Sequence, residues 1–173
     1  PTYQWQESIN GGGTWNNITN GGVYGGATDL VLACDFRVGS QVAEMFMPAA
    51  KLGIHFYQRG LVRYVSRLGV DTAKRLLLTA EKIQATEMKE IGFLTRLVKP
   101  EELDSSVEEL VQKLMLMAPL AILGMKKHIN TIASNTLNVD ELNQDIATAQ
   151  NSEDLQEGRT AWAEKRAPIF KGR

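Results

Sequence analysis

With 173 residues, the chain is long enough for one domain with a sizeable core, because a domain of this size buries roughly 70% of its unfolded surface. The net charge of −1, with acidic and basic residues interspersed, argues against nucleic acid or an anionic membrane surface as partners. No apolar run is long enough to span a membrane and no secretion signal starts the chain, so we expect a soluble protein of the cytoplasm.

The first twenty residues carry little structural signal. They are rich in Gly, Asn and Thr and show no lasting period. We predict only a short strand at residues 3–6 and a turn at residues 11–13. The composition assigns this segment no role.

Two glycine pairs, Gly21-Gly22 and Gly25-Gly26, run directly into an apolar segment that carries one acid, Asp29. The segment after Gly26 has too few polar residues for an exposed helix, so it predicts a buried one. The first turn of such a helix has N–H groups without an intrahelical acceptor, and these favour negative charge. Glycine at this point allows a ligand or another backbone to come close.

Asp29 has two interpretations at this helix start. If Gly26 is the N-cap, Asp29 is the third helical residue, where a carboxylate offsets the helix dipole by roughly 0.3–1 kcal/mol. Alternatively, Asp29 is a general acid or base beside backbone N–H groups that hold a developing oxyanion. Composition and spacing leave both interpretations open.

Metal and nucleotide sites find little support in the sequence. The single cysteine, Cys34, lies in the apolar segment and excludes a disulfide framework or a cysteine-based metal site. His55 and His128 are far apart in sequence, so we expect no metal site. The glycine pairs lack the Gly-Lys-Ser/Thr of a Walker motif and do not form G-x-G-x-x-G.

Strands and helices alternate in the middle of the chain, and helices alone follow. The predicted middle elements are a strand at 35–40, an extended piece at 43–54, a helix from residue 60 to a C-cap at Gly69, a helix at 71–83 with Asp71 as N-cap, a short helix ending at Gly92, and a strand at 93–98. Four further helices are predicted after these elements. The first starts with a capping box of Ser105 and Glu108, and the others start at Pro119, at Asn138 with Glu141, and at Ser152. This order predicts an α/β core with a helical C-terminal layer.

From Asn20 to Arg173 the chain resembles the crotonase superfamily, the enoyl-CoA hydratase/isomerase proteins. The central motif of that family is Asn-Gly, a spacer, Gly-Gly-Gly, a small residue, Glu, Leu and an apolar stretch to Ala-Cys-Asp. Here it reads NGGVYGGATDL and ends in Ala33-Cys34-Asp35. Further matching blocks are DFRVGS, EMFMPAAKLGI, AKRLLLTAEKIQATEMKEIGFLTRLV and EKRAPIFKGR.

The resemblance implies an α/β fold with a crotonase-like ββα spiral core and a helical C-terminal oligomerisation region that makes trimers or hexamers. It implies an acyl-CoA substrate, with coenzyme A as part of the substrate and no separate cofactor. The match is to the C-terminal two-thirds of a typical member. We therefore divide the chain into an unmatched leader at 1–19, a core at 20–103 and a helical region at 104–173.

The resemblance also implies roles for individual residues. Gly26 falls at one of the two backbone donors that hold the thioester oxygen, and Asp29 falls at the first of two catalytic glutamates, one methylene shorter. The resemblance implies that Gly25 and Ala49 line the acyl pocket. His55 and Tyr57 occupy the next loop, from which either could reach that pocket, and a packing role for His55 stays open. By position, Phe170 matches the acyl pocket of a neighbouring subunit and Lys165 and Lys171 match its CoA pocket, although a solvated basic tail stays open.

One departure bears directly on the reaction. The second glutamate of hydratases follows the proline at Pro48, where this chain has Ala49, which cannot move a proton. Glu44 is not an obvious substitute, because an extended segment would turn it to the face opposite Ala49. The resemblance implies hydration of a 2-enoyl thioester, and it leaves open isomerisation by a single carboxylate or a non-catalytic assembly role.

Overall fold

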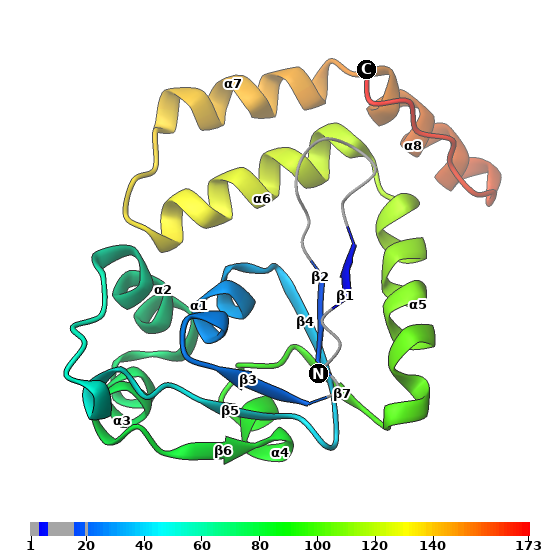
Figure 1. Ribbon diagram of the computed structural model, residues 1–173. Coiled ribbons are helices and arrows are strands. Elements are labelled where there is room, and N and C mark those ends of the chain that lie inside the picture. Colours follow the sequence, from blue (N-terminus) through cyan, green and yellow to red (C-terminus); the bar gives the residue numbers. More distant parts are fainter. Residues whose placement is uncertain (1–3, 7–15, 20) are drawn as a thin grey trace. The chain divides into compact units, whose positions relative to one another are not determined.

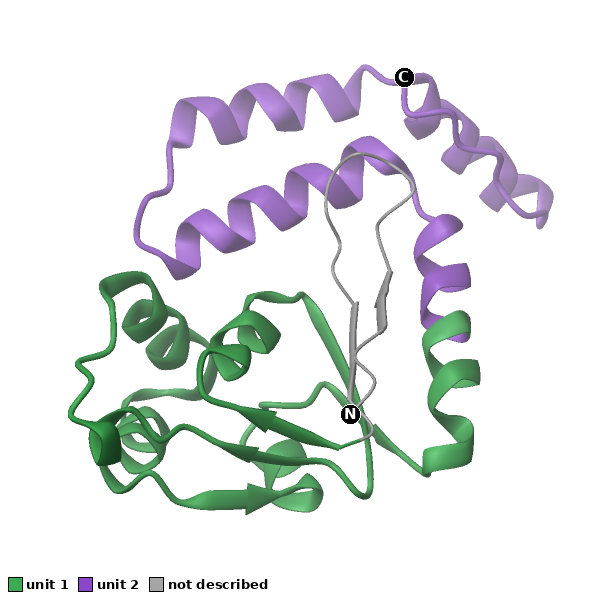
Figure 2. Ribbon diagram, viewed as in Figure 1, with its two compact units in different colours: residues 1–108 green, residues 109–173 purple. Residues whose placement is uncertain are grey.

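The computed structural model describes residues 4–6, 16–19 and 21–173 (Figure 1). It divides the chain into two compact units, residues 1–108 and 109–173 (Figure 2). The predicted strand position Tyr3 and the predicted turn at residues 11–13 lie outside the described residues. Among the described residues, no helix is long and apolar enough to cross a membrane.

Two sheets are formed by the described strands of the first unit. The strands are β1 (Gln4–Gln6), β2 (Asn16–Thr19), β3 (Gly22–Tyr24), β4 (Phe36–Ser40), β5 (Glu44–Phe46), β6 (Lys82–Gln84) and β7 (Arg96–Val98). One sheet has the order β1-β2-β4-β7 and the other the order β3-β5-β6. The β1–β2 and β5–β6 pairs are antiparallel, and the other pairs are parallel.

The order strand, strand, helix occurs twice in succession, which confirms the predicted ββα spiral. The first turn is β2, β3 and α1 (Gly26–Ala33), and the second is β4, β5 and α2 (Gln58–Leu68). Equivalent strands of the two turns pair in parallel, β2 with β4 and β3 with β5. The spiral therefore sets α1 and α2 one after the other, and the two helices pack together.

The remaining helices of the first unit follow α2. They are α3 (Val70–Thr79), α4 (Ala85–Glu90) and the start of α5 (Leu103–Met115), with 3₁₀ turns η1 (Ala49–Leu52) and η2 (Pro100–Glu102). The core includes Val23, Leu32, Met45, Tyr64 and Phe93, all buried, so it draws side chains from β3, β5 and the helices. α1 is half-buried rather than buried all round, because Leu30 is 48% exposed while Val31 and Leu32 are covered.

The second unit is helical, as predicted. After the end of α5 it contains α6 (Pro119–Ala133), α7 (Val139–Gln150) and α8 (Glu153–Glu164). Three predicted helix starts are confirmed: Pro119 opens α6, the Asn138 side chain accepts from the N–H of Asp140 and Glu141, and Ser152 accepts from the N–H of Leu155. α7 packs against both α6 and α8.

Several predicted boundaries are wrong, and each has a local reason. Asp71 is not an N-cap, because Gly69, with φ of 80°, separates α2 from α3 and the helix begins at Val70. That helix stops at Thr79, where Ala80 takes a left-handed conformation. Ser105 forms no capping box, since η2 leads straight into α5 and places Ser105 inside the helix.

Two further corrections concern the candidate site. Gly25 rather than Gly26 is the N-cap of α1, so Asp29 is the fourth helical residue and not the third. The segment after Phe46 is not extended throughout, because Pro48 leads into the 3₁₀ turn η1 that starts at Ala49.

Candidate active site

The turn before α1 requires glycine. Gly25 has φ of 57° and ψ of −132°, a conformation that residues with a side chain rarely adopt. Its N–H donates to the carbonyl of Phe46 over 2.9 Å, which ties the turn to the end of β5. A Cβ at Gly26 would meet no other atom of the described residues within 4 Å. As the first residue of α1, Gly26 also has an N–H without an acceptor inside the helix.

The peptide unit between Gly25 and Gly26 is held from its carbonyl side. The carbonyl oxygen of Gly25 accepts from the N–H of Thr28 over 3.0 Å and from the Thr28 hydroxyl over 2.7 Å. The Thr28 hydroxyl in turn lies 2.5 Å from the hydroxyl of Tyr64, on α2. Both side chains are completely buried, so water does not compete for these bonds.

Asp29 lies one turn into α1 and is 4% exposed. Burying a carboxylate is costly unless it is paired, and here Nη1 of Arg63 lies 2.5 Å from Oδ1. The hydroxyl of Tyr57 donates to the other oxygen, Oδ2. Tyr57 is the N-cap of α2 and Arg63 lies within α2, so this one helix supplies both partners.

Tyr57 is the accessible member of this group, with 54% of its surface exposed. The hydrogen bond to Asp29, followed by desolvation, raises the pKa of Tyr57, so the phenol keeps its proton and remains a donor. Its ring is held by Phe56 at 4.8 Å between centroids. A Cβ at Gly60 would meet the Phe56 ring at 2.4 Å, which shows why this ring needs a glycine beside it.

The Tyr57 hydroxyl contacts the carboxylate of Asp29, whereas the His55 ring contacts the backbone beside it. His55 is exposed, and its Nδ1 lies 2.8 Å from the carbonyl oxygen of Phe56. Ala49 is buried at the start of η1 and offers no polar group.

Glu44 is engaged elsewhere, in agreement with the expectation that it does not replace the missing acid. Lys82 lies 2.9 Å from its Oε1, and Tyr24 and Gln84 also donate to the carboxylate. These hydrogen bonds, with Lys82 foremost, lower the pKa of Glu44 to about 2. Met45, Met47 and Ala49 are buried, so the alternation of faces persists although η1 is not a strand.

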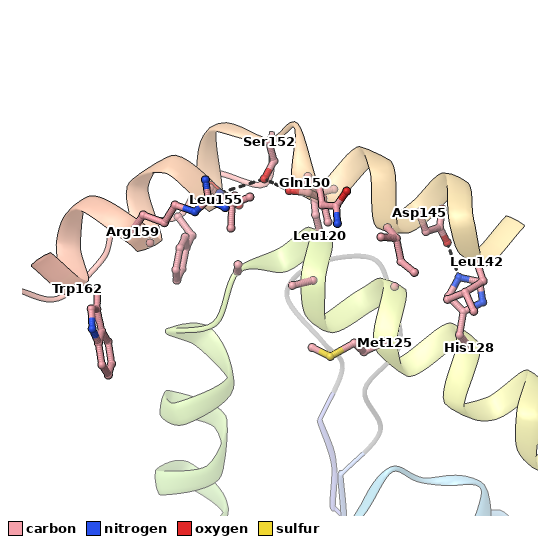
Figure 3. Close-up of a pocket in the computed structure, with 18 residues that line it drawn as sticks. Leu120, Met125, His128, Leu142, Asp145, Gln150, Ser152, Leu155, Arg159 and Trp162 are labelled. Atoms are coloured by element: carbon pink, nitrogen blue, oxygen red, sulfur yellow. Dashed lines mark hydrogen bonds and ion pairs between the residues drawn. The ribbon is translucent and has the colours of Figure 1, made fainter.

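The three candidates near the C-terminus belong to the second unit. Phe170 lines a cavity of about 680 Å³ between α6, α7 and α8. Figure 3 shows that Met125, His128 and Trp162 also line this cavity. Lys165 ends α8 in a left-handed conformation with φ of 55°. The N–H of Lys171 donates to Asp154 over 2.7 Å.

Sequence reasoning missed Arg63, Thr28 and Tyr64. A buried acid needs a cation, and this rule points to the basic residues of α2, which are Arg59, Arg63 and Arg67. The rule alone does not select Arg63 among them. Thr28 and Tyr64 carry no comparable signal, because each looks like an ordinary core residue of its helix.

Comparisons with known proteins agree with this geometry. The family model described as Enoyl-CoA hydratase/isomerase matches residues 17–173. Carnitinyl-CoA dehydratase of Salmonella typhi is 35% identical over 162 residues, which cover 89% of this chain and 61% of that protein. The chain thus spans about three-fifths of the length of the curated relatives that it matches.

Solved structures give the same result. Enoyl-CoA hydratase from Bacillus anthracis is 30% identical with a TM-score of 0.82, over 90% of this chain and 62% of that one. An enoyl-CoA hydratase/carnithine racemase from Magnetospirillum magneticum, 22% identical over 91% of this chain and 59% of that one, has the same fold with a TM-score of 0.85. On the family match, the relatives and the ββα spiral together, the chain belongs to the enoyl-CoA hydratase/isomerase family.

Proposed function

We propose that the chain acts on an acyl-CoA thioester by stabilising an enolate at the start of α1. The observation that carries this proposal is the placement of Asp29 one turn beyond Gly26, whose N–H is the first of α1 and has no acceptor inside the helix. A helix start offers partial positive charge where the thioester oxygen gains negative charge. Membership of the enoyl-CoA hydratase/isomerase family supports the same chemistry.

Asp29 is the proposed acid/base of the reaction. When a proton leaves the α-carbon, its electron pair moves onto the thioester oxygen, which the N–H of Gly26 holds. Asp29 is buried, whereas Tyr57 is exposed and hydrogen-bonded to it. Tyr57 therefore stands between the carboxylate and the open side of the site, where it contacts the acyl group. Gly25, Ala49 and His55 are proposed to line the same acyl site. Phe170, Lys165 and Lys171 are proposed to contact the acyl and CoA pockets of a neighbouring subunit.

Hydration of a 2-enoyl thioester is the proposed reaction. Asp29 takes a proton from water as the water oxygen bonds to the β-carbon, the electron pair of the double bond moves into the enolate, and Asp29 then gives that proton to the α-carbon. The relatives named carnitinyl-CoA dehydratase, which remove water from a CoA thioester, support this reaction type. No separate cofactor enters these steps, since coenzyme A is part of the substrate.

Double-bond isomerisation is the second candidate, and Ala49 favours it. With alanine in place of the second acid, one carboxylate remains to move a proton between two carbons of one substrate. A 3-enoyl thioester that is converted to the 2-enoyl form without uptake of water would support isomerisation. Uptake of water by a 2-enoyl thioester would support hydration.

A non-catalytic assembly protein is the third candidate. Large apolar side chains on helices of the second unit are exposed, among them Met115, Met125 and Trp162. We propose that they contact further copies in a homotrimer or a hexamer, and that the assembly lies in the cytoplasm. Light scattering after size exclusion measures the number of copies. Binding of a CoA thioester without turnover would favour this candidate over both enzymes.

Asp29→Asn tests the proposed mechanism. Turnover of a panel of 2-enoyl and 3-enoyl thioesters should fall by about 10²–10⁴-fold, the usual contribution of a general acid or base. Since this change leaves Arg63 without its partner, the double variant Asp29→Asn, Arg63→Met is assayed beside it, together with thermal melting. Glu44→Gln, which also removes a paired carboxylate, is the matched control and should retain turnover. Unchanged turnover in Asp29→Asn would rule out the proposed role of Asp29.

A further inference from the structure

We propose that Thr28 and Tyr64 are positioning residues for the oxyanion donor, because they hold the peptide unit that presents the N–H of Gly26. The inference rests on the proposed function of that N–H. It assigns a role to two buried hydroxyl groups that neither bind the carboxylate nor line the open side of the site.

The direction of the Gly26 N–H is set by the peptide unit that joins Gly25 to Gly26. The carbonyl of Gly25 and the N–H of Gly26 belong to the same planar group and point in opposite directions. Whatever fixes the carbonyl therefore fixes the N–H. Two donors fix the carbonyl, the N–H of Thr28 at 3.0 Å and its hydroxyl at 2.7 Å.

The orientation of this peptide unit is not fixed by the glycines themselves and needs support from other residues. It lies between two glycines, the residue type with the widest choice of backbone conformations. Gly25 already has a positive φ of 57°. Rotation of the peptide unit would change the direction of the Gly26 N–H and spoil the donor. The Thr28 bonds oppose this rotation.

The chain of hydrogen bonds continues from Thr28 to Tyr64 on α2. The Thr28 hydroxyl has one proton, and it is used on the Gly25 carbonyl, so the hydroxyl accepts from Tyr64 over 2.5 Å. Burial raises the pKa of Tyr64 to about 12, which keeps the phenol in its donor form. The rings of Tyr64 and Phe56 pack in a T-shaped arrangement with 5.7 Å between their centroids, which holds the Tyr64 ring in place.

The bonds run in one direction, from Tyr64 to Thr28, to the Gly25 carbonyl, and through the peptide unit to the Gly26 N–H. Hydrogen bonds in such a chain polarise one another and strengthen the last donor. Arg63 and Tyr64 are neighbours on α2, so adjacent residues serve the two halves of the site. Arg63 holds the carboxylate of Asp29, and Tyr64 holds the oxyanion donor.

The test uses Tyr64→Phe, Thr28→Val and Thr28→Ser in the full chain. A thioester labelled with ¹³C at its carbonyl is bound, and the downward shift of the C=O stretch is measured by infrared difference spectroscopy. We expect Tyr64→Phe and Thr28→Val to lose a large part of the wild-type shift, and Thr28→Ser to keep it. In turnover, we expect kcat to fall about tenfold with little change in KM, as for a group that acts in the transition state.

A readout without ligand covers the case in which a variant binds poorly. The amide resonance of ¹⁵N-labelled Gly26 should move in Tyr64→Phe and Thr28→Val and stay in place in Thr28→Ser. The matched control is Thr79→Val, because the Thr79 hydroxyl makes a similar bond of 2.6 Å to the carbonyl of Arg75 at an exposed position of α3. That control should change neither signal.

The possible outcomes distinguish a failure of this inference from a failure of the proposed function. A wild-type chain that binds the thioester without a carbonyl shift would overturn the oxyanion role of Gly26, and the inference with it. A wild-type shift that persists undiminished in both Tyr64→Phe and Thr28→Val would overturn the inference alone. A loss shared with Thr79→Val would also overturn it, because the effect would then be one of general stability.

Discussion

The polar groups of the candidate site and those at the helix starts of the second unit find their partners at different distances along the chain. In the first unit, Asp29 and Thr28 find their partners on α2, 34 and 36 residues further along the chain. In the second unit, Asn138 and Ser152 bond to N–H groups two or three residues away. The site of the first unit therefore depends on the packing of α1 against α2, whereas the helix ends of the second depend on local sequence. Variants in each unit can break this contrast.

The largest effect is expected for Arg63→Leu, which leaves Asp29 buried without its cation. Removing one member of a buried ion pair costs about 3 kcal/mol or more in the free energy of unfolding. Urea denaturation measures this loss, and the double variant Asp29→Leu, Arg63→Leu should recover most of it. Arg75→Leu, which removes an exposed pair with Glu81 and Glu87, should cost less than about 1 kcal/mol. Equal losses in Arg63→Leu and Arg75→Leu would contradict the dependence on burial.

A smaller effect is expected for Asp154→Ala in the second unit. The Asp154 carboxylate is buried and accepts from the N–H of Lys171 at 2.7 Å and of Gly172 at 2.8 Å. Its loss leaves two donors without an acceptor and should cost about 2 kcal/mol. Hydrogen exchange should speed up at residues 171–172 and stay unchanged in α1. Glu153→Ala, which removes an exposed pair with Arg173, is the control and should leave exchange unaltered.

Variants at the helix starts of the second unit should lower the free energy of unfolding by a smaller amount. Asn138→Ala and Ser152→Ala should each cost about 1 kcal/mol, the usual value of an N-cap. Ser105→Ala is the control and should cost nothing, because Ser105 lies inside α5 and its hydroxyl bonds back to the carbonyl of Glu102. Thermal melting measures the stability of the three variants against that of the wild-type chain. A loss in Ser105→Ala as large as in Asn138→Ala would contradict the helix start at Leu103.

The smallest effect is expected from Glu44, through pH. Its hydrogen bonds, chiefly with Lys82, lower the pKa from 4.5 to about 2, so the folded chain binds the proton less readily than the unfolded chain. The stability that this group contributes is fully present above pH 4.5 and is lost as the pH falls towards 2. Glu44→Gln should therefore flatten the acid limb of a stability-against-pH curve. An unchanged acid limb would contradict the pairing with Lys82.

The contrast between local and long-range partners also explains what the sequence could predict. Asn138, Ser152 and Pro119 act on their own helix ends, so residue type and spacing sufficed to place them. Asp71 failed because Gly69 already ended one helix and began the next, with no room for a further cap. Ser105 failed because a 3₁₀ turn started the helix earlier.

At the candidate site, the family motif located Gly26 and Asp29 but not their supports. The pairing of Asp29 with Arg63, and of Thr28 with Tyr64, needs α2 to lie against α1 in one register. That register follows from the parallel pairing of β2 with β4 and β3 with β5, which no short motif encodes. Sequence patterns therefore located the candidate residues more readily than the contacts that hold them.

The central claim is that Asp29 moves a proton at the α-carbon of a thioester held by Gly26. The most direct measurement is exchange of the α-protons of a bound acyl-CoA for deuterium in D₂O, followed by mass spectrometry. The account predicts exchange by the wild-type chain and by Glu44→Gln, and its loss in Asp29→Asn at a thioester concentration that saturates both. Exchange at the wild-type rate in Asp29→Asn would contradict the claim.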